Sequence, residues 1–248
     1  MKGLLVVIFL AAQVCGVHAA KQYRDFMDTK GRTIRGCVQA FDKRTGTVTF
    51  ERDNHRTSKV PITIFSDADQ NYIKEWECSK QFLSDTKFKI SAQRKKAKDK
   101  DASYSSSITS EKVELMGYEV VLENCSATPL KNIEVEYCIY YEQDEIRKHK
   151  QYVAEGVFCG SFPRGTFPPK TKMEKMTKTV KIYKKELDSG WIYTSDIKNV
   201  QKGRVRGIWI RVYMNLSSGE KLTRNYCLPD SLNNSKAWMR SSVNVGMN

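Results

Sequence analysis

The sequence has few of the residues that enzymes use for acid–base chemistry and metal binding. Only three histidines occur among 248 residues, and two of them, His55 and His149, stand in charged, turn-like segments. There is no Cys-x-x-Cys pair, His-Glu-x-x-His helix, Gly-x-Ser-x-Gly elbow or glycine-rich phosphate loop. We therefore expect no catalytic residue, no metal site and no cofactor. A hydrolase built on an unrecognised carboxylate pair stays open, since a sequence does not place two carboxylates across a bond.

Long apolar runs are missing except at the N-terminus. Lys2 is followed by the apolar run Gly3–Ala12 and by Val17-His18-Ala19, a small-x-small cleavage site. This is the layout of a secretory signal peptide, and the run is shorter than the roughly 20 residues that span a bilayer. We predict that residues 1–19 are removed and that the mature chain, starting near Ala20, is exported to the periplasm or beyond. No membrane-spanning segment is expected after cleavage.

Acidic residues are outnumbered, and the formal net charge is +14. A basic surface favours anionic partners such as nucleic acid, acidic polysaccharide, lipid headgroups or acidic peptides. The lysines and arginines are densest in residues 94–100 and 168–185. Both runs lack the aromatic residues that stack on bases in a groove for single-stranded nucleic acid. This argues against a nucleic-acid partner. We interpret both basic runs as solvent-exposed loops and strand faces. The alternative is that one of them forms an anion-binding site.

Six cysteines remain after the leader, and an even number in an exported chain permits disulfides. They are Cys37, Cys78, Cys125, Cys138, Cys159 and Cys227. Cys138 and Cys159 fall on consecutive expected strands, and Cys37 and Cys78 fall in the first half of the chain, so these are the preferred pairs. Partly buried thiols are the alternative. Their spacing does not match a zinc site.

Residues 22–76 read as about four short strands followed by one helix. Turn signals, such as Gly31 and the Asp42–Gly46 loop, separate segments rich in β-branched and aromatic residues. Ser66 is the expected helix N-cap, with Asp69 three residues later. Ala68, Tyr72 and Trp76, with Ile73 beside them, are expected to form the apolar face. This pattern predicts a small barrel.

Three motifs in this region carry a family resemblance. They are Phe26-x-Asp28-x-Lys30-Gly31-Arg32-Thr33-Ile34, Val60-Pro61-Ile62 and Phe65-Ser66-Asp67-Ala68-Asp69-Gln70-Asn71-Tyr72-Ile73. The region resembles the Sla-one homology domain, an SH3-like barrel found in a yeast endocytic adaptor and in exported planctomycete and verrucomicrobial proteins. The resemblance implies a protein- or peptide-binding module with an unknown ligand. One departure is Asn54-His55 in the third hairpin, where the family often has Asp-Gly.

The rest of the chain is expected to be a second, β-rich domain. Residues 77–85 read as a polar linker, residues 94–111 as a mobile loop and residues 241–248 as a disordered tail. Between 86 and 240, about seven segments alternate apolar and polar residues, which predicts an antiparallel sandwich. Glu123–Val135, and Phe167–Thr171 with the strand after it, resemble bacterial immunoglobulin- or fibronectin-like domains. That resemblance implies fold class only.

We predict a mainly β, non-catalytic protein: an SH3-like barrel followed by an immunoglobulin-like sandwich. Its expected role is to bind a protein or peptide in the cell envelope, as an adaptor or structural protein. The alternative is a carbohydrate-binding module for anionic envelope polysaccharide, which would use exposed aromatics such as Trp191, Trp209 and Tyr213 to stack on sugars. The candidate ligand contacts are Lys30, Arg32, Trp191 and Tyr193.

Overall fold

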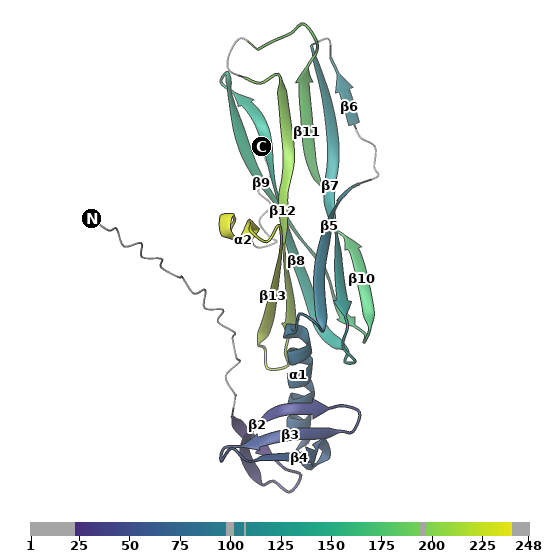
Figure 1. The fold of residues 1–248 in the computed structure, drawn as a ribbon, viewed down its shortest axis with the longest axis vertical. Helices are drawn as coiled ribbons and strands as arrows, with labels where there is room; N and C mark the ends of the chain where they lie inside the picture. The colour runs from purple at the N-terminus through teal and green to yellow at the C-terminus, as the bar shows by residue number, and fades with distance from the viewer. Residues whose placement is uncertain (1–22, 98–101, 107, 194–196, 240–248) are drawn as a thin grey trace, which may run out of the picture. The chain divides into compact units, whose positions relative to one another are not determined.

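A computed structural model describes residues 23–97, 102–106, 108–193 and 197–239. The predicted leader and the predicted tail at 241–248 lie outside these residues. The chain is mainly β with antiparallel sheets, as predicted, and it divides into two compact units. Unit 1 extends to Lys74 and unit 2 begins at Glu75 (Figure 1). No helix among the described residues is long and apolar enough to cross a membrane.

Unit 1 contains a four-stranded antiparallel sheet in the order β1-β2-β3-β4. The strands are β1 (Arg24–Met27), β2 (Thr33–Asp42), β3 (Thr47–Arg52) and β4 (Thr57–Pro61). Gly31 and Gly46 turn the chain with φ of +77° and +66°, which glycine adopts without a Cβ clash. In the third hairpin the left-handed residue is His55, with φ of 63°.

A 3-10 turn, η1 (Ile62–Ile64), leads into helix α1 (Asp67–Leu83). Ser66 caps the helix as predicted, because its Oγ accepts the Asp69 N–H at 3.3 Å. Ile73 is buried as predicted, but Asp69 is buried as well and Ala68 is exposed, so the buried helix face differs in part from the prediction. Ile73 joins a core that also contains Phe26, Val48, Phe50 and Phe65.

Unit 2 holds the remaining nine strands. They are β5 (Phe88–Lys96), β6 (Ala102–Ser105), β7 (Thr109–Asn124), β8 (Leu130–Arg147), β9 (Lys150–Phe167), β10 (Thr171–Met176), β11 (Val180–Leu187), β12 (Val200–Asn215) and β13 (Lys221–Leu228). Two expectations are corrected. Residues 77–83 form the last turns of α1 rather than a linker, because Phe82 is buried against Phe88. Much of 94–111 is strand.

The strands of unit 2 form two layers over part of their length and one sheet at one end. β7 pairs with β5 and β10 in its C-terminal half, and with β6 and β11 in its N-terminal half. The other layer has the order β13-β12-β8-β9, and β11 hydrogen-bonds to both β7 and β12. Buried side chains from the two layers make one core, including Leu122, Tyr137 and Ile210.

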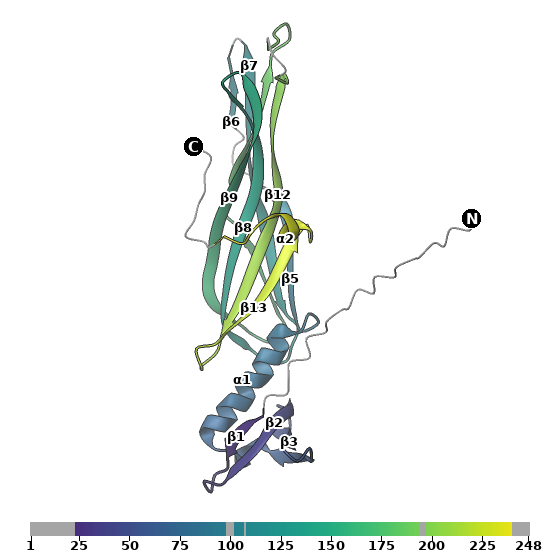
Figure 2. The same ribbon diagram turned by 90° about the vertical axis from the view of Figure 1, so that its left-hand side faces the viewer.

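The C-terminal segment of unit 2, residues 231–239, covers the outer face of this second layer. It contains the short helix α2 (Leu232–Ser235), which lies beside β12 and β13 in Figure 2. Leu232 is buried with Cys138, Tyr140 and Cys227, and Trp238 packs against the same cluster. The layer is therefore covered by apolar side chains on both faces in this region.

Candidate functional site

One groove of unit 2 lies between two strand edges. β13 pairs with β12 on one edge and β5 pairs with β7 on one edge, while the other edge of each strand has no strand partner among the described residues. The groove between these edges has a volume of about 380 Å³. An unpaired strand edge presents backbone N–H and C=O groups in a row, which is a template for another extended chain.

The groove is lined by both apolar and polar side chains. They are Asp85, Lys89, Ile90, Ser91, Val121, Glu123, Arg224, Asn225 and Tyr226. Their positions follow from strand pairing, because alternate residues point to opposite faces. Tyr226 pairs with buried Ile210, so it lies on the core side of β13. Ser91 pairs with Val121 and is exposed. The groove therefore has an apolar floor and a polar rim.

Arg224 belongs to the wall of the groove. Its guanidinium donates hydrogen bonds to the backbone carbonyls of Phe82 and Phe88, and it forms an ion pair with Asp85. Only 13% of the Arg224 side chain is exposed. Burial lowers the pKa of this guanidinium, while the Asp85 carboxylate raises it. These contacts hold the end of α1 against β5 and β13, so Arg224 positions the groove.

A second groove, of about 280 Å³, opens between β9 and β10. Its charged lining residues are all cationic: Arg164, Lys172 and Lys175. Two of them are partly neutralised, since Lys172 lies 2.6 Å from Glu174 and Arg164 lies 3.8 Å from Glu134. This groove suits an anionic ligand better than the first one does.

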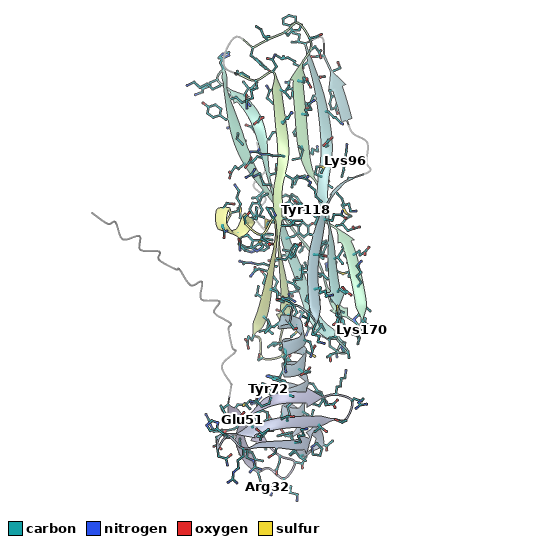
Figure 3. The ribbon with its side chains drawn as sticks, viewed as in Figure 1. Arg32, Glu51, Tyr72, Lys96, Tyr118 and Lys170 are labelled. Carbon is teal, nitrogen blue, oxygen red and sulfur yellow. A yellow bond between two sulfur atoms is a disulfide. The ribbon has the colours of Figure 1, made fainter. Side chains whose placement is uncertain are left out.

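Lys30 and Arg32, predicted as ligand contacts, lie in the β1–β2 turn of unit 1. One carboxylate oxygen of Asp28 accepts the backbone N–H groups of both residues, at 2.9 and 2.8 Å. The other accepts Nε of Arg32 at 2.7 Å. These hydrogen bonds hold the pKa of Asp28 below its usual value. The Arg32 side chain, labelled in Figure 3, is 73% exposed and organises the turn through Asp28.

Trp191 and Tyr193, the other two predicted contacts, lie between β11 and β12 in unit 2. Trp191 is exposed and Tyr193 is half-buried. Two of the four predicted residues therefore belong to each unit. Neither pair lines a groove described above.

The aromatic residues expected on strand faces are engaged within the protein. Tyr140 is buried, and the ring of Trp209 meets that of Trp238 edge to face, with centroids 5.8 Å apart. Tyr213 donates a hydrogen bond to Glu136 and carries the Lys221 ammonium over its ring at 4.0 Å. These contacts leave no open row of rings here for stacking on sugar.

The cysteines follow one of the two expected pairings. Cys138 and Cys159 face each other on β8 and β9 and form a disulfide. Cys37 and Cys78 are not joined, so that expectation is wrong for this structure. Cys37 is buried on β2, with Nε2 of Gln39 at 3.1 Å from its sulfur. The Cys78 thiol on α1 points to the carbonyl of Pro129. Each therefore belongs to the packing of its own unit.

One cluster of buried polar groups outside the grooves surrounds Glu51 in unit 1. Glu51 on β3, labelled in Figure 3, accepts hydrogen bonds from Tyr23 at 2.6 Å and from Gln39 at 3.0 Å. His55 approaches it at 3.3 Å. The carboxylate raises the pKa of the Tyr23 hydroxyl. In the described part of the chain, no group of three or more His, Cys, Asp or Glu side chains is arranged to hold a metal ion.

Sequence reasoning missed the residues of the β5–β13 groove. Their shared position depends on pairings between distant segments, and only the strand character of 221–228 could be read locally. The mixture of apolar and polar side chains on these two strands gave no further signal.

Comparison with known proteins adds little. No family model and no curated protein matches the chain. Among solved structures, it is similar to Spo0M, a sporulation control protein from Bacillus subtilis, at 10% identity and a TM-score of 0.19. The match covers 57% of this chain and 48%, about half, of that protein's chain. A likeness at this level carries no argument about function.

Proposed function

We propose that the chain is an exported, non-catalytic adaptor that binds an extended peptide segment of a partner protein. The binding site is the β5–β13 groove of unit 2. The observation that carries the proposal is the pair of unpartnered strand edges beside one groove. A peptide that adds to either edge gains main-chain hydrogen bonds, and its alternate side chains enter the groove.

The lining chemistry supports a peptide rather than a small metabolite. Ile90 and Tyr226 offer apolar contact at the floor, whereas Lys89 and Glu123 offer one charge of each sign at the rim. Because the charges are balanced, affinity depends on backbone pairing and apolar contact, and it depends little on net charge. Arg224 keeps the groove open at a fixed width by bonding the carbonyls of Phe82 and Phe88.

In this proposal, unit 1 is an SH3-like barrel and unit 2 an immunoglobulin-like sandwich. Four short antiparallel strands with a 3-10 turn and a helix support the first assignment. Two packed antiparallel layers support the second, although nine strands and the bridging β11 depart from a simple sandwich. The motifs resembling the Sla-one homology domain make unit 1 a second protein-binding module.

The alternative is binding of an anionic polysaccharide. The β9–β10 groove favours it, because Arg164, Lys172 and Lys175 line the groove without a carboxylate among the lining residues. Salt separates the two functions. A contact that depends on charge weakens steeply as ionic strength rises, whereas a peptide held by backbone pairing and apolar burial weakens little.

A selection experiment tests the peptide proposal. A random peptide library displayed on phage is selected on the full chain, and the affinities of synthetic copies are measured by calorimetry. Ser91→Arg places a long side chain in the groove from an exposed position, and Ser110→Arg makes the same change at an exposed position of β7. We expect at least about tenfold weaker binding in the Ser91 variant only. Enriched peptides that bind both variants equally, or no enrichment, would contradict the site.

A further inference from the structure

One end of unit 2 exposes an unusual number of apolar side chains. At this end the strands form one sheet in the order β6-β7-β11-β12-β8-β9. We call seven exposed residues of its loops and hairpins the tip surface. They are Tyr104, Ile108, Ile146, Tyr152, Val153, Trp191 and Ile192. Their exposed fractions run from 37% for Ile146 to 77% for Ile192.

Hydrogen bonds tie the three contributing segments together. The N–H of Asp188 donates to the carbonyl of Ile108 at 2.9 Å, which joins the segment after β11 to the β6–β7 hairpin. The N–H of Lys198 donates to the side chain of Gln151 at 3.1 Å, which joins the segment before β12 to the β8–β9 hairpin. The apolar residues are therefore held at one end of the unit by its own architecture.

The β8–β9 hairpin is apolar on both faces near its end. Ile146 pairs with Gln151, while Val153 pairs with Asp144, so Ile146 and Val153 share one face. Tyr152 pairs with Glu145 and lies on the opposite face. All three apolar side chains are exposed. A hairpin end with apolar groups on both faces fits a medium that surrounds it better than a partner that covers one side.

The turn of this hairpin also carries positive charge. Arg147 pairs with Lys150, and the two residues between them, Lys148 and His149, have φ of 50° and 60°. A two-residue turn of this kind normally contains Asn or Gly, because side chains with a Cβ are disfavoured at positive φ. Here the turn instead presents basic side chains at the end of the hairpin.

The charge around the tip surface is positive. Lys148, Lys150, Lys185 and Lys198 form no ion pair within 4.0 Å among the described residues. Two nearby acidic side chains are paired with cations, since Glu145 lies 2.6 Å from Arg147 and Glu186 lies 2.7 Å from Lys184. Glu111, Asp144 and Asp188 also lie near the tip surface, but the lysines and Arg147 outnumber these carboxylates. An anionic surface would therefore meet cations around the apolar residues.

We propose that the tip surface docks on an anionic lipid bilayer, with its apolar side chains in the interfacial layer and its lysines among the headgroups. Trp and Tyr are favoured at membrane interfaces, and each basic residue near an anionic leaflet adds attraction. A bilayer surrounds a projecting hairpin, which suits apolar side chains on both of its faces. The tip residues line neither groove described above. The inference goes beyond the peptide adaptor, since it fixes that adaptor to a membrane surface.

Vesicle co-sedimentation tests the proposal on the full chain without its leader. The probes are phosphatidylcholine vesicles and vesicles of equal parts phosphatidylcholine and phosphatidylglycerol. We expect binding to the anionic vesicles that falls at least about tenfold in Ile192→Glu and in Val153→Glu. Leu83→Glu and Met176→Glu are matched controls within unit 2, because these apolar side chains are 50% and 45% exposed on α1 and β10, outside the tip surface. Near-ultraviolet circular dichroism checks that each variant is folded.

Fluorescence adds an independent readout. Trp191 is 52% exposed, so its emission should move to shorter wavelength with anionic vesicles, and Trp191→Phe should remove that change. The proposal is overturned if the wild-type chain binds neither vesicle, or if the control variants lose as much binding as the tip variants. Immobilised polygalacturonate, an anionic polysaccharide, serves as the competing ligand. The proposal is also overturned if the tip variants bind it less than the wild type does and still bind vesicles normally, because the tip surface would then bind polysaccharide and not lipid. Ser91→Arg should leave vesicle binding unchanged, which separates this test from that of the peptide groove.

Discussion

The carboxylate of Asp69, in the first turn of α1, accepts the backbone N–H of Met27 on β1 at 2.6 Å. Its second oxygen accepts a guanidinium N–H of Arg24 at 2.9 Å. The same guanidinium lies 4.0 Å from the ring centroid of Tyr72, which is labelled in Figure 3. One buried side chain thus fixes the start of the helix to the sheet within unit 1.

Loss of this carboxylate should destabilise unit 1. Asp69→Ala removes a charge-assisted hydrogen bond and leaves the Met27 N–H without its acceptor, at a cost of about 2–4 kcal/mol. Asp67→Ala, at an exposed position of the same helical turn, should cost less than about 1 kcal/mol. Urea unfolding followed by circular dichroism gives both values. Equal losses in the two variants would contradict the role of Asp69.

Asp28, in the β1–β2 turn, should make the stability of unit 1 depend on pH. The folded-state pKa of Asp28 is lowered by the N–H groups of Arg32 and Lys30. The unfolded chain therefore binds the proton more tightly, so the stabilisation is present above about pH 4 and disappears as pH falls through the lowered pKa. In acid titrations of stability, Asp28→Asn should be less stable than wild type at pH 7, and the difference should shrink below about pH 4.

Asp25→Asn serves as the control for this titration. The Asp25 side chain is 61% exposed and lies 3.5 Å from Arg35. Its stability curve should follow that of the wild type, since exposed ion pairs contribute little. A parallel shift of the Asp28→Asn curve at all pH values would show that the turn does not depend on this ionisation.

The disulfide between β8 and β9 should stabilise unit 2. Cys138 and Cys159 are 21 residues apart in sequence. A disulfide that closes a loop of this size stabilises the folded state by about 3 kcal/mol, because it reduces the conformational entropy of the unfolded chain. Replacing both with serine should lower the free energy of unfolding by that amount. The difference should vanish when the wild type is measured in a reducing agent. Cys125→Ser, at a half-buried thiol, provides the control in both conditions.

Tyr140 should hold the C-terminal segment in place. Its buried hydroxyl donates to the carbonyl of Ala237 at 2.6 Å, and burial raises the pKa of this hydroxyl to about 12. Tyr140→Phe should cost about 1 kcal/mol and speed proteolytic cleavage within 231–239. Tyr213→Phe loses a hydrogen bond to Glu136 instead, and should leave the cleavage rate unchanged. Limited proteolysis followed by mass spectrometry measures both.

Local signals in the sequence predicted local structure well. The Ser66 cap lies where its hydroxyl and Asp69 indicated, and the alternation of apolar and polar residues expected between 86 and 240 is present in strands β8 and β12. The disulfide at Cys138 followed from consecutive strands, whose pairing is the simplest one available. These features depend on residues that are close in sequence. Residue composition and the two-residue alternation of apolar and polar side chains were therefore sufficient to predict them.

Features that depend on distant segments were missed. The polar composition of 77–83 indicated a linker, but burial of Phe82 against Phe88 extends the helix. Cys37 and Cys78 share the first half of the chain, yet each packs within its own unit. The groove beside Ser91 exists because β5 and β13 are edge strands, and edges are set by the complete sheet order. Trp191 was identified as exposed, but not the apolar residues that accompany it.

The position of β12 has a consequence for the order in which the chain can fold. β12 pairs along most of β8, which precedes it by many residues, and it also supports β11 and β13. A nascent chain that ends before Val200 holds β8 with one edge unpaired and with buried positions such as Ile139 lacking their cross-strand neighbour, here Ile208. Contacts so distant in sequence slow folding. Unit 2 therefore cannot complete this layer until residues near Asn215 have emerged.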